Sequence, residues 1–261
     1  MPAQEEVNSV SGEEQAADKR GHKRDPRSYD RHGHPRKELT IALAGNPNSG
    51  KTTVFNNLTG ARQHVGNWPG VTVEKKEGSL RYANYDIKVV DLPGVYSLTA
   101  YSLDEVIARD FVVDENPDVV VNIVDASNLE RNLYLAVQLL EMGAPLIIAL
   151  NMMDVAESRR YRIDVDALAR EIGAPVVSMV ATRNQGTQEL LQTVMEVVKG
   201  NIKVTGLRLQ YGREVEEELA KLEEVISSNS LSKKYPARWL AVKLLEEDEE
   251  IIRKFMELQV G

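Results

Sequence analysis

Gly45-Asn46-Pro47-Asn48-Ser49-Gly50-Lys51-Thr52 is the stretch that decides the fold, because it matches the pattern G-x-x-x-x-G-K-[ST]. An apolar run over residues 39–44 precedes it and predicts a strand, and residues 53–58 continue with helical spacing. Between a strand and a helix, the glycines of such a loop let backbone N–H groups turn toward a phosphate. The stretch therefore predicts a nucleotide-binding P-loop; the alternative is a glycine-rich turn that binds nothing.

The polar residues of this loop have expected parts in phosphate binding. Lys51 would reach the β- and γ-phosphates, and Thr52 would be a ligand of Mg²⁺. The residues predicted to contact the nucleotide here are Asn46, Asn48, Ser49, Gly50, Lys51, Thr52 and Thr53.

The segment 61–74 follows the predicted helix and contains two glycines and a proline. We expect a long loop that exposes Trp68, and such loops without regular structure are usually functional. Thr72 is the candidate for a switch threonine that closes on Mg²⁺ and the γ-phosphate when a triphosphate binds. The alternative is that Thr72 only begins the next strand.

A hairpin and an acidic motif come next. Residues 74–82 and 86–91 predict two antiparallel strands, and the second ends in Asp91-Leu92-Pro93-Gly94. An acid at the carboxyl end of a buried strand can bind Mg²⁺, and the N–H of Gly94 can meet the γ-phosphate. This D-x-x-G motif is weak alone, but its place after a P-loop strengthens it.

Helices and strands then alternate up to residue 198. Short, continuously apolar strands between helices indicate a parallel sheet with helices on both faces. The sequence therefore predicts an α/β domain with a mostly parallel six-stranded sheet. The predicted strands are 39–44, 74–82, 86–91, 119–124, 146–150 and 175–179, and the helices after the hairpin are 105–114, 129–142 and 188–198.

Asn151-Met152-Met153-Asp154 stands at the carboxyl end of a predicted strand, where ligands of open α/β sheets bind. Asp154 would accept hydrogen bonds from N1 and N2 of guanine, a pair of donors that adenine lacks. Met152 replaces a lysine usual at this position, so a thioether chain would cover the base. Val180-Ala181-Thr182 would place a backbone N–H on guanine O6. The alternative is that Asn151 and Asp154 only cap the following turn.

Composition narrows the class of protein. The chain has 261 residues, 42% of them hydrophobic, no cysteine and a formal net charge of −8. A disulfide framework and a thiolate metal site are therefore excluded, and the charge argues against a nucleic-acid-binding surface. The start of the chain lacks the features of a signal peptide, and no apolar run is long enough to span a membrane, so we expect a soluble, cytosolic chain.

Residues 1–37 are polar, with acids first and bases later, and predict a disordered charged tail. Metal capture by His22, His32 and His34, or contact of the basic block with anionic lipid or phosphate, is the alternative.

The ordered motifs resemble the Ras-like translation-factor branch of GTPases. The residues around them are more specific: Val65 to Glu74, Asp91 to Leu98 and Pro236 to Leu245 are similar to the cytoplasmic part of the ferrous iron transporter family FeoB. This resemblance covers about residues 38–261. It implies a Ras-like GTP-binding domain at 38–199, a helical GDI-like domain at 200–261, and a polytopic membrane domain that this chain does not contain.

Residues 200–261 support an appended helical domain on their own. Residues 214–226 and 238–256 read as two amphipathic helices, and 229–232 as a linker. We expect Trp239 to lie in the core of this domain. The acidic run 246–250 is expected to form a solvated face.

The resemblance also implies how hydrolysis is assisted. Ras-type enzymes have a water-orienting glutamine directly after D-x-x-G, and Val95 stands there. The resemblance implies that K⁺ supplies a fixed positive charge instead, held by Asn48 and by first-switch carbonyls, for which Gly66 and Trp68 are candidates. For Asn48 the alternative is a local hydrogen bond that stabilises the turn. The expected catalytic residues are Asn48, Lys51, Thr72 and Gly94.

We therefore predict a slow GTP-hydrolysing switch that regulates ferrous iron passage through a membrane domain, with Mg²⁺ and K⁺ as cofactors. Expected partners are GTP or GDP, that membrane domain, small Feo accessory proteins and a second copy of the chain, but no nucleic acid. The expected place is the cytoplasmic face of the cell membrane. The alternatives are a soluble ribosome- or RNA-associated GTPase, and a scaffold that binds GTP without useful turnover.

Overall fold

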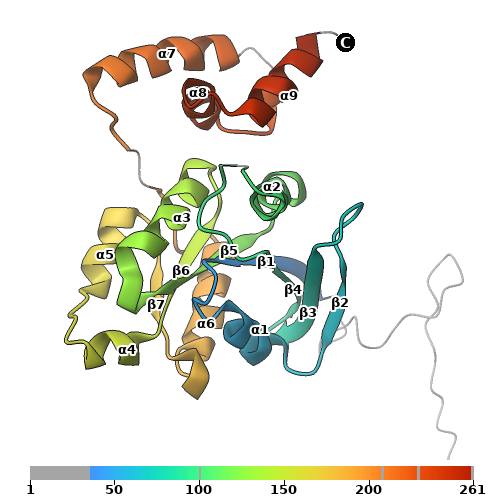
Figure 1. Cartoon of the computed structure of the whole chain (residues 1–261). Helices are drawn as coiled ribbons and strands as arrows, with labels where there is room; N and C mark the ends of the chain where they lie inside the picture. The colour runs from blue at the N-terminus through green and yellow to red at the C-terminus, as the bar shows by residue number, and fades with distance from the viewer. Residues whose placement is uncertain (1–35, 100, 207–208, 228–229, 260–261) are drawn as a thin grey trace, which may run out of the picture. The chain divides into compact units, whose positions relative to one another are not determined.

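A seven-stranded sheet with helices on both faces forms the centre of the protein (Figure 1). The structure is a computed structural model that describes residues 36–99, 101–206, 209–227 and 230–259. The predicted tail and its three histidines lie outside these residues, apart from the last two positions, 36 and 37.

The strand order is β2-β3-β4-β1-β5-β6-β7. Strands β1, β5, β6 and β7 run parallel, and β2, β3 and β4 form an antiparallel meander. The strands are β1 (Lys37–Gly45), β2 (Gln63–Asn67), β3 (Glu74–Tyr82), β4 (Tyr85–Asp91), β5 (Val119–Asp125), β6 (Leu146–Asn151) and β7 (Val176–Ser178).

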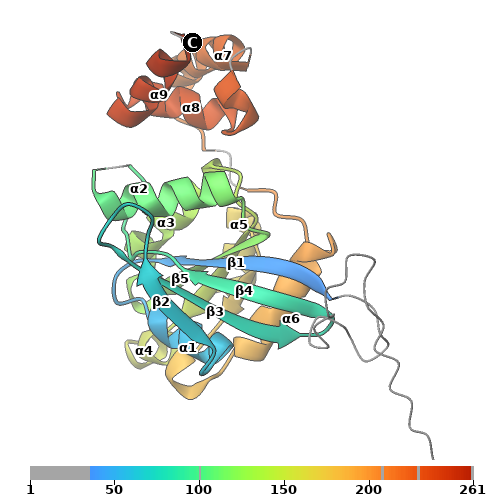
Figure 2. The same cartoon turned by 90° about the vertical axis from the view of Figure 1, so that its right-hand side faces the viewer.

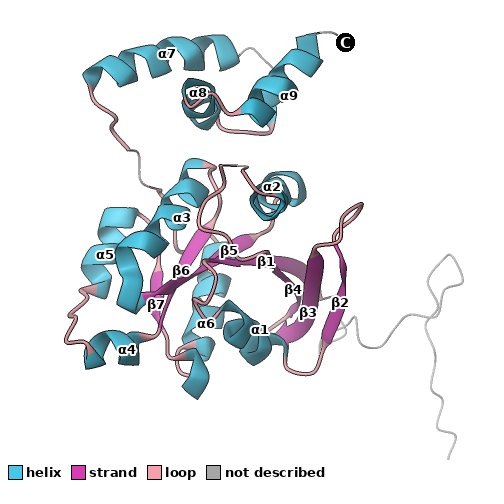
Figure 3. Cartoon of the chain, viewed as in Figure 1, coloured by secondary structure: helices cyan, strands magenta, loops and turns pink. Residues whose placement is uncertain are grey.

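Helices cover the two faces of the sheet in separate layers (Figures 2 and 3). Helices α1 and α6 pack on one face through residues such as Phe55 and Leu190. Helices α2, α3 and α5 pack on the other face, where Leu135 and Ile172 are buried. Alternating side chains of β1, β5 and β6 fill both layers, as expected for a doubly covered sheet. These helices are α1 (Lys51–Thr59), α2 (Leu103–Asp110), α3 (Leu129–Glu141), α4 (Met153–Ser158), α5 (Val165–Ile172) and α6 (Thr187–Val198).

The prediction of six strands was wrong by one. The extra strand, β2, lies in the segment expected to be a long loop, and it pairs antiparallel with β3 from Gln63↔Gly78 to Asn67↔Glu74. Its residues are mostly exposed, so its sequence shows no alternation of apolar and polar residues. The loop that remains, residues 68–73, is a short turn closed by a hydrogen bond from the Trp68 N–H to the Val73 carbonyl (2.9 Å).

The predicted helix 105–114 is also interrupted. Helix α2 begins with a capping box made by Ser102 and Glu105, and it ends at Asp110. The chain then continues as a π-helical turn, Phe111–Glu115. Such turns are rare and often occur at functional sites.

The C-terminal part is helical, as predicted, but with three helices. They are α7 (Arg213–Ser227), α8 (Ala237–Leu245) and α9 (Glu249–Gln259). The single helix expected over 238–256 breaks where Glu247 has a φ of 57° and Asp248 caps α9 by accepting from the Ile251 N–H (3.1 Å). Trp239 is buried and stacks on Tyr235 with ring centroids 5.1 Å apart, which confirms its core role.

The acidic run 246–250 is not a wholly solvated face, contrary to expectation. Asp248 and Glu250 are largely covered because they meet Arg109 of α2, whose side chain is 0% exposed. The guanidinium lies 2.6 Å from a Glu250 oxygen and 3.5 Å from an Asp248 oxygen. Burial alone would raise the pKa of Glu250, but Arg109 and Lys254 together lower it from the ordinary 4.5.

In the part of the chain that the structure describes, every helix is too short or too polar to cross a membrane.

Candidate nucleotide-binding site

The predicted site residues gather at one edge of the sheet. The P-loop follows β1, the D-x-x-G motif ends β4, the N-x-x-D motif ends β6, and the turn Ala181–Arg183 comes after β7 (Figure 1). Strands β1, β5, β6 and β7 are parallel, so their carboxyl ends meet at this edge. The topology therefore brings together motifs that are far apart in the sequence.

The P-loop and the N-x-x-D motif interlock at Gly50. The Asn151 amide donates to the Ser49 carbonyl (3.0 Å). A Cβ on Gly50 would lie 2.3 Å from that amide nitrogen and 3.7 Å from the Met152 methyl group. Because Gly50 also has a φ of 90°, only glycine fits both the space and the backbone. Asn151, predicted to belong to the base site, thus also stabilises the P-loop.

Lys51 and Asp91 lie together beneath the P-loop. The Lys51 ammonium donates to the Asp91 carboxylate and to the Leu92 carbonyl (2.6 Å). Both side chains are shielded, with exposed fractions of 12% and 7%. Thr52 and Thr53 begin α1, and Thr52 is exposed. The lysine predicted to bind phosphate thus lies beside the acid predicted to bind Mg²⁺.

Thr52 and Asp91 could hold Mg²⁺ only together with oxygen atoms of a bound nucleotide or of water. The Thr52 hydroxyl and the Asp91 carboxylate are hard oxygen donors of the kind that Mg²⁺ prefers. Within the described ranges, His, Cys, Asp and Glu form no group of three that could hold a metal. Phosphate oxygens and water would have to complete the coordination, as is usual for Mg²⁺ at nucleotide sites.

The D-x-x-G loop touches the P-loop directly. The Val95 N–H donates to the Gly45 carbonyl (3.3 Å), and a Cβ on Gly94 would lie 3.5 Å from the Pro47 backbone. Gly94 is therefore next to the loop that would hold the phosphates. The Val95 side chain is buried, so this position supplies apolar packing instead of a group for water.

The segment 61–74, expected to be a long loop that exposes Trp68, buries that side chain instead. Trp68 is 7% exposed, because its ring packs edge-on against Phe111 (5.5 Å), and Lys75 lies over it (4.8 Å). The prediction of an exposed aromatic was wrong because a residue of the π-helical turn covers it. Thr72 is exposed in the turn before β3 and is not part of a strand.

The residues proposed for K⁺ are one residue of the P-loop, Asn48, and two of the β2–β3 hairpin, Gly66 and Trp68. Asn48 is exposed, with a φ of 65°, a conformation that asparagine tolerates better than most residues. Gly66 pairs with Lys75 inside the hairpin, and the Trp68 carbonyl accepts from the Val71 N–H (3.2 Å). The backbone conformation alone thus gives asparagine a local reason to occupy position 48.

Asn46 has its side chain turned into the protein. It is 2% exposed, and its amide donates to the Arg131 carbonyl of α3 (3.4 Å). Any contact of Asn46 with a nucleotide would therefore come from the backbone. Arg131 also lies over the Tyr96 ring (4.0 Å), which connects α3 with the D-x-x-G loop.

The base-reading segments are bonded to each other. In the stretch Val180–Thr182, predicted to place a backbone N–H on guanine O6, the Ala181 N–H donates to the Asn151 side-chain oxygen (2.9 Å). Val180 begins the turn and Thr182 is exposed within it. Two residues near the predicted base site were not predicted from the sequence. The Asn57 amide donates to the Ala181 carbonyl (2.8 Å), and Arg183 forms an ion pair with Asp154. Arg183 could have been found from its place after the Val180–Thr182 stretch, but Asn57 carries no such signal.

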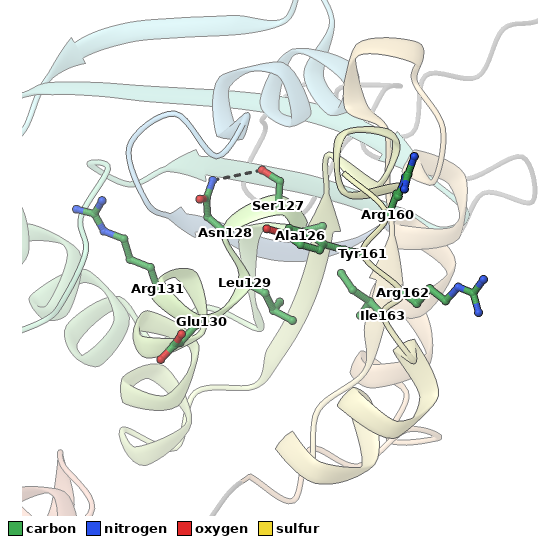
Figure 4. A pocket seen from close by; sticks show the side chains of 10 residues that line it. All are labelled: Ala126, Ser127, Asn128, Leu129, Glu130, Arg131, Arg160, Tyr161, Arg162 and Ile163. Carbon is green, nitrogen blue, oxygen red and sulfur yellow. Dashed lines mark hydrogen bonds between the residues drawn. The ribbon is translucent and has the colours of Figure 1, made fainter. Parts of the chain in front are cut away.

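A pocket of about 610 Å³ opens beside this site (Figure 4). It is lined by residues 126–131 and 160–163, and none of the predicted nucleotide-contacting residues lines it. Figure 4 shows its walls coming from the start of α3 and from the segment after α4. The nucleotide site is therefore defined by the motif geometry, not by the pocket.

Comparisons with known proteins agree with this geometry. The family model described as "Ferrous iron transport protein B" matches residues 39–194, and the model of the FeoB cytosolic helical domain matches residues 211–259. The Fe(2+) transporter FeoB of Escherichia coli K12 is 49% identical over 216 residues, which are 81% of this chain and 27% of the relative. A Porphyromonas gingivalis protein named as a fusion of Fe(2+) transport protein A and FeoB is 48% identical over 219 residues, 82% of this chain and 26% of that protein.

Solved structures of the cytosolic domain of T. maritima FeoB have the same fold. The GDP form II is 40% identical with a TM-score of 0.80, covering 85% of this chain and 86% of that one. The GMPPNP form is 39% identical with a TM-score of 0.78, covering 84% and 86%. This chain spans about a quarter of the length of the curated relatives. It belongs to the ferrous iron transport protein B family, and it comprises the GTPase domain and the cytosolic helical domain of that family.

Proposed function

We propose that this chain is the GTP-binding and GTP-hydrolysing regulatory region of a prokaryotic ferrous iron transporter. The observation that carries the proposal is the interlock of the P-loop with the N-x-x-D motif through Gly50 and Asn151, because it joins phosphate binding to guanine recognition. The T. maritima relative, whose structures are described as GDP and GMPPNP forms, supports the choice of nucleotide.

In this proposal each residue acts by charge or by position. Lys51 would exchange its contact with Asp91 for contacts with the β- and γ-phosphates, and Asp91 and Thr52 would be the residues that hold Mg²⁺. Gly94 offers its N–H to the γ-phosphate from beside Pro47. Mg²⁺, when bound with the nucleotide, neutralises phosphate charge. Such fixed donors lower the barrier by electrostatic stabilisation, without acid–base chemistry by the protein.

Hydrolysis is slow in this proposal, because Val95 cannot hydrogen-bond a water. Asn48 and the carbonyls of Gly66 and Trp68 would hold a monovalent cation, K⁺, which would supply additional positive charge beside the phosphates. Thr72 closes on Mg²⁺ and the γ-phosphate in the triphosphate state. The Trp68 carbonyl accepts from the Val71 N–H and has a second lone pair for the cation.

The domain boundaries and partners belong to the same proposal. Residues 38–199 form the GTP-binding domain, 200–261 the helical GDI-like domain, and 1–37 a charged tail. A membrane domain of the same transporter is the main partner, at the cytoplasmic face of the membrane. The fused protein of P. gingivalis supports a small accessory protein as a further partner. A second copy of the chain stays a prediction.

The test is phosphate release by the purified chain with Mg²⁺ and either GTP or ATP. We expect release from GTP only, and none from the Lys51→Ala variant. GTP binding without phosphate release would favour the nucleotide-dependent scaffold. Turnover that depends on added ribosomes or RNA would favour the ribosome-associated GTPase, which the net charge of −8 argues against.

A further inference from the structure

Arg183 contacts the carboxylate that is assigned to guanine. Its Nη2 atom lies 3.3 Å from Oδ2 of Asp154. Arg183 ends the turn after β7, whereas Asp154 lies in the first turn of α4 after β6. The pair therefore connects the two segments proposed to read the base.

A count of hydrogen-bond acceptors shows what this contact leaves free. An ionised carboxylate has about four acceptor positions, two on each oxygen. Oδ1 of Asp154 accepts from the Val155 N–H (3.0 Å), and Oδ2 faces Arg183. One position remains on each oxygen, and guanine presents two donors on one edge, the N1–H and the 2-amino group. The protein contacts thus orient the carboxylate without filling the positions that the base needs.

We propose that Arg183 is a positioning residue that fixes the Asp154 carboxylate for the two donors of guanine, and so contributes to base specificity. This inference rests on the proposed function, because it assumes that Asp154 reads the base. A carboxylate that a neighbouring residue already holds in the bound orientation loses less conformational entropy when the base binds, so such a neighbour can increase the affinity.

The backbone that carries Arg183 is itself held. Its own N–H donates to the Val180 carbonyl (2.9 Å), and the Asn184 N–H donates to the Ala181 carbonyl (3.0 Å). Val180 and Gln185 exchange two backbone hydrogen bonds of 3.2 Å. Arg183 therefore projects from a fixed turn, although its side chain is 63% exposed. An exposed ion pair has a modest effect, so we expect a change of roughly two- to fivefold in affinity.

The experiment compares GDP with IDP, which lacks the 2-amino group but has the same phosphates. Calorimetry or stopped-flow release would measure both ligands on the wild type and on Arg183→Ala, Arg183→Lys and Arg81→Ala. Arg81 forms a comparable exposed ion pair with Asp86 (3.0 Å) on the β3–β4 hairpin, so its variant controls for lost charge.

We expect Arg183→Ala to weaken GDP binding two- to fivefold and IDP binding less, because a mobile carboxylate loses two contacts to guanine but one to hypoxanthine. Arg183→Lys should restore part of the GDP preference, and Arg81→Ala should match the wild type. Equal losses for both ligands, or no loss, would overturn the inference.

Asp154→Asn separates this inference from the proposed function. If it leaves GDP affinity unchanged, the assignment of the base site fails. If it weakens GDP while Arg183→Ala does not, only the role of Arg183 fails.

Discussion

The protein has two shielded groups of ion pairs, Lys51 with Asp91 and Arg109 with Asp248 and Glu250, and we expect them to have different roles. Lys51 and Asp91 lie under the P-loop, and in the proposed function both would change partners on binding of phosphates and a metal. Arg109 belongs to α2, and its side chain, which is 0% exposed, contacts Asp248 and Glu250 at the start of α9. We expect the Lys51–Asp91 pair to break when a nucleotide binds, and the contacts of Arg109 to stay intact in the folded protein. Loss of the first should therefore impair nucleotide binding, and loss of the second should impair stability.

The largest effect expected is on stability, for Arg109→Ala. The variant removes a fully buried cation from Asp248 and Glu250, although Glu250 keeps its ion pair with Lys254 (3.1 Å). Breaking a buried ion pair by removing one partner typically costs about 3–5 kcal/mol. Urea denaturation would measure this loss in the free energy of unfolding. The control is Lys234→Ala, which removes a half-exposed pair with Asp114 and should cost less than about 1 kcal/mol. Similar values for the two variants would contradict the distinction between the pairs.

At the nucleotide edge, the largest effect expected is that of Asp154→Asn. Loss of a charged hydrogen bond to guanine should cost roughly 1.5–3 kcal/mol, or about ten- to a hundredfold in GDP affinity. The variant should favour xanthine nucleotides, whose ring has an acceptor where guanine has a donor. Calorimetry with GDP and XDP would measure both changes, and unfolding in urea should stay near the wild-type value because Asp154 is not a buried core residue.

A several-fold effect is expected from the cation. GTP turnover by the wild type should be faster in KCl than in NaCl at equal ionic strength, which separates specific binding from screening. Asn48→Ala should remove the difference while keeping GDP affinity. Equal rates in the two salts would mean that Asn48 is present only for its left-handed backbone conformation. Stimulation by K⁺ in both the wild type and Asn48→Ala would indicate that the carbonyls of Gly66 and Trp68, and not Asn48, bind the cation.

The smallest effect expected is the pH dependence of the α2–α9 contact. The pKa of Glu250 is lower in the folded protein than its ordinary 4.5, so its contribution to stability is complete above that value. It is lost as the pH falls through the lowered pKa. Urea unfolding followed from pH 7 down to pH 3 should therefore show a shallower decline below pH 4.5 for Glu250→Gln than for the wild type. Parallel curves would show that Arg109 does not depend on the charge of this partner.

The sequence predicted the local features well and the contacts between distant segments poorly. The P-loop, Asp91, and Asn151 with Asp154 are motifs whose spacing is fixed by one strand and one turn, so their position at the edge of the sheet followed from the α/β pattern. Strand β2 was missed because an exposed edge strand needs no apolar alternation.

The burial of Trp68 depends on Phe111, and the burial of Arg109 depends on Asp248 and Glu250. Such contacts are set by tertiary packing, which propensity and periodicity do not report. The same reason explains why Asn57 was not predicted, since only the fold brings it to the Ala181 carbonyl.

The edge-on contact between Trp68 and Phe111 also gives the protein an optical reporter. The chain has two tryptophans, and the second, Trp239, is stacked on Tyr235 in the helical part. In a Trp239→Phe variant, the emission of Trp68 alone would follow the hairpin turn. Any movement of that turn that separates the indole from Phe111 would transfer the ring from an apolar environment to water and shift its emission to longer wavelength. The opening of the hairpin could thus be timed in solution without an attached dye.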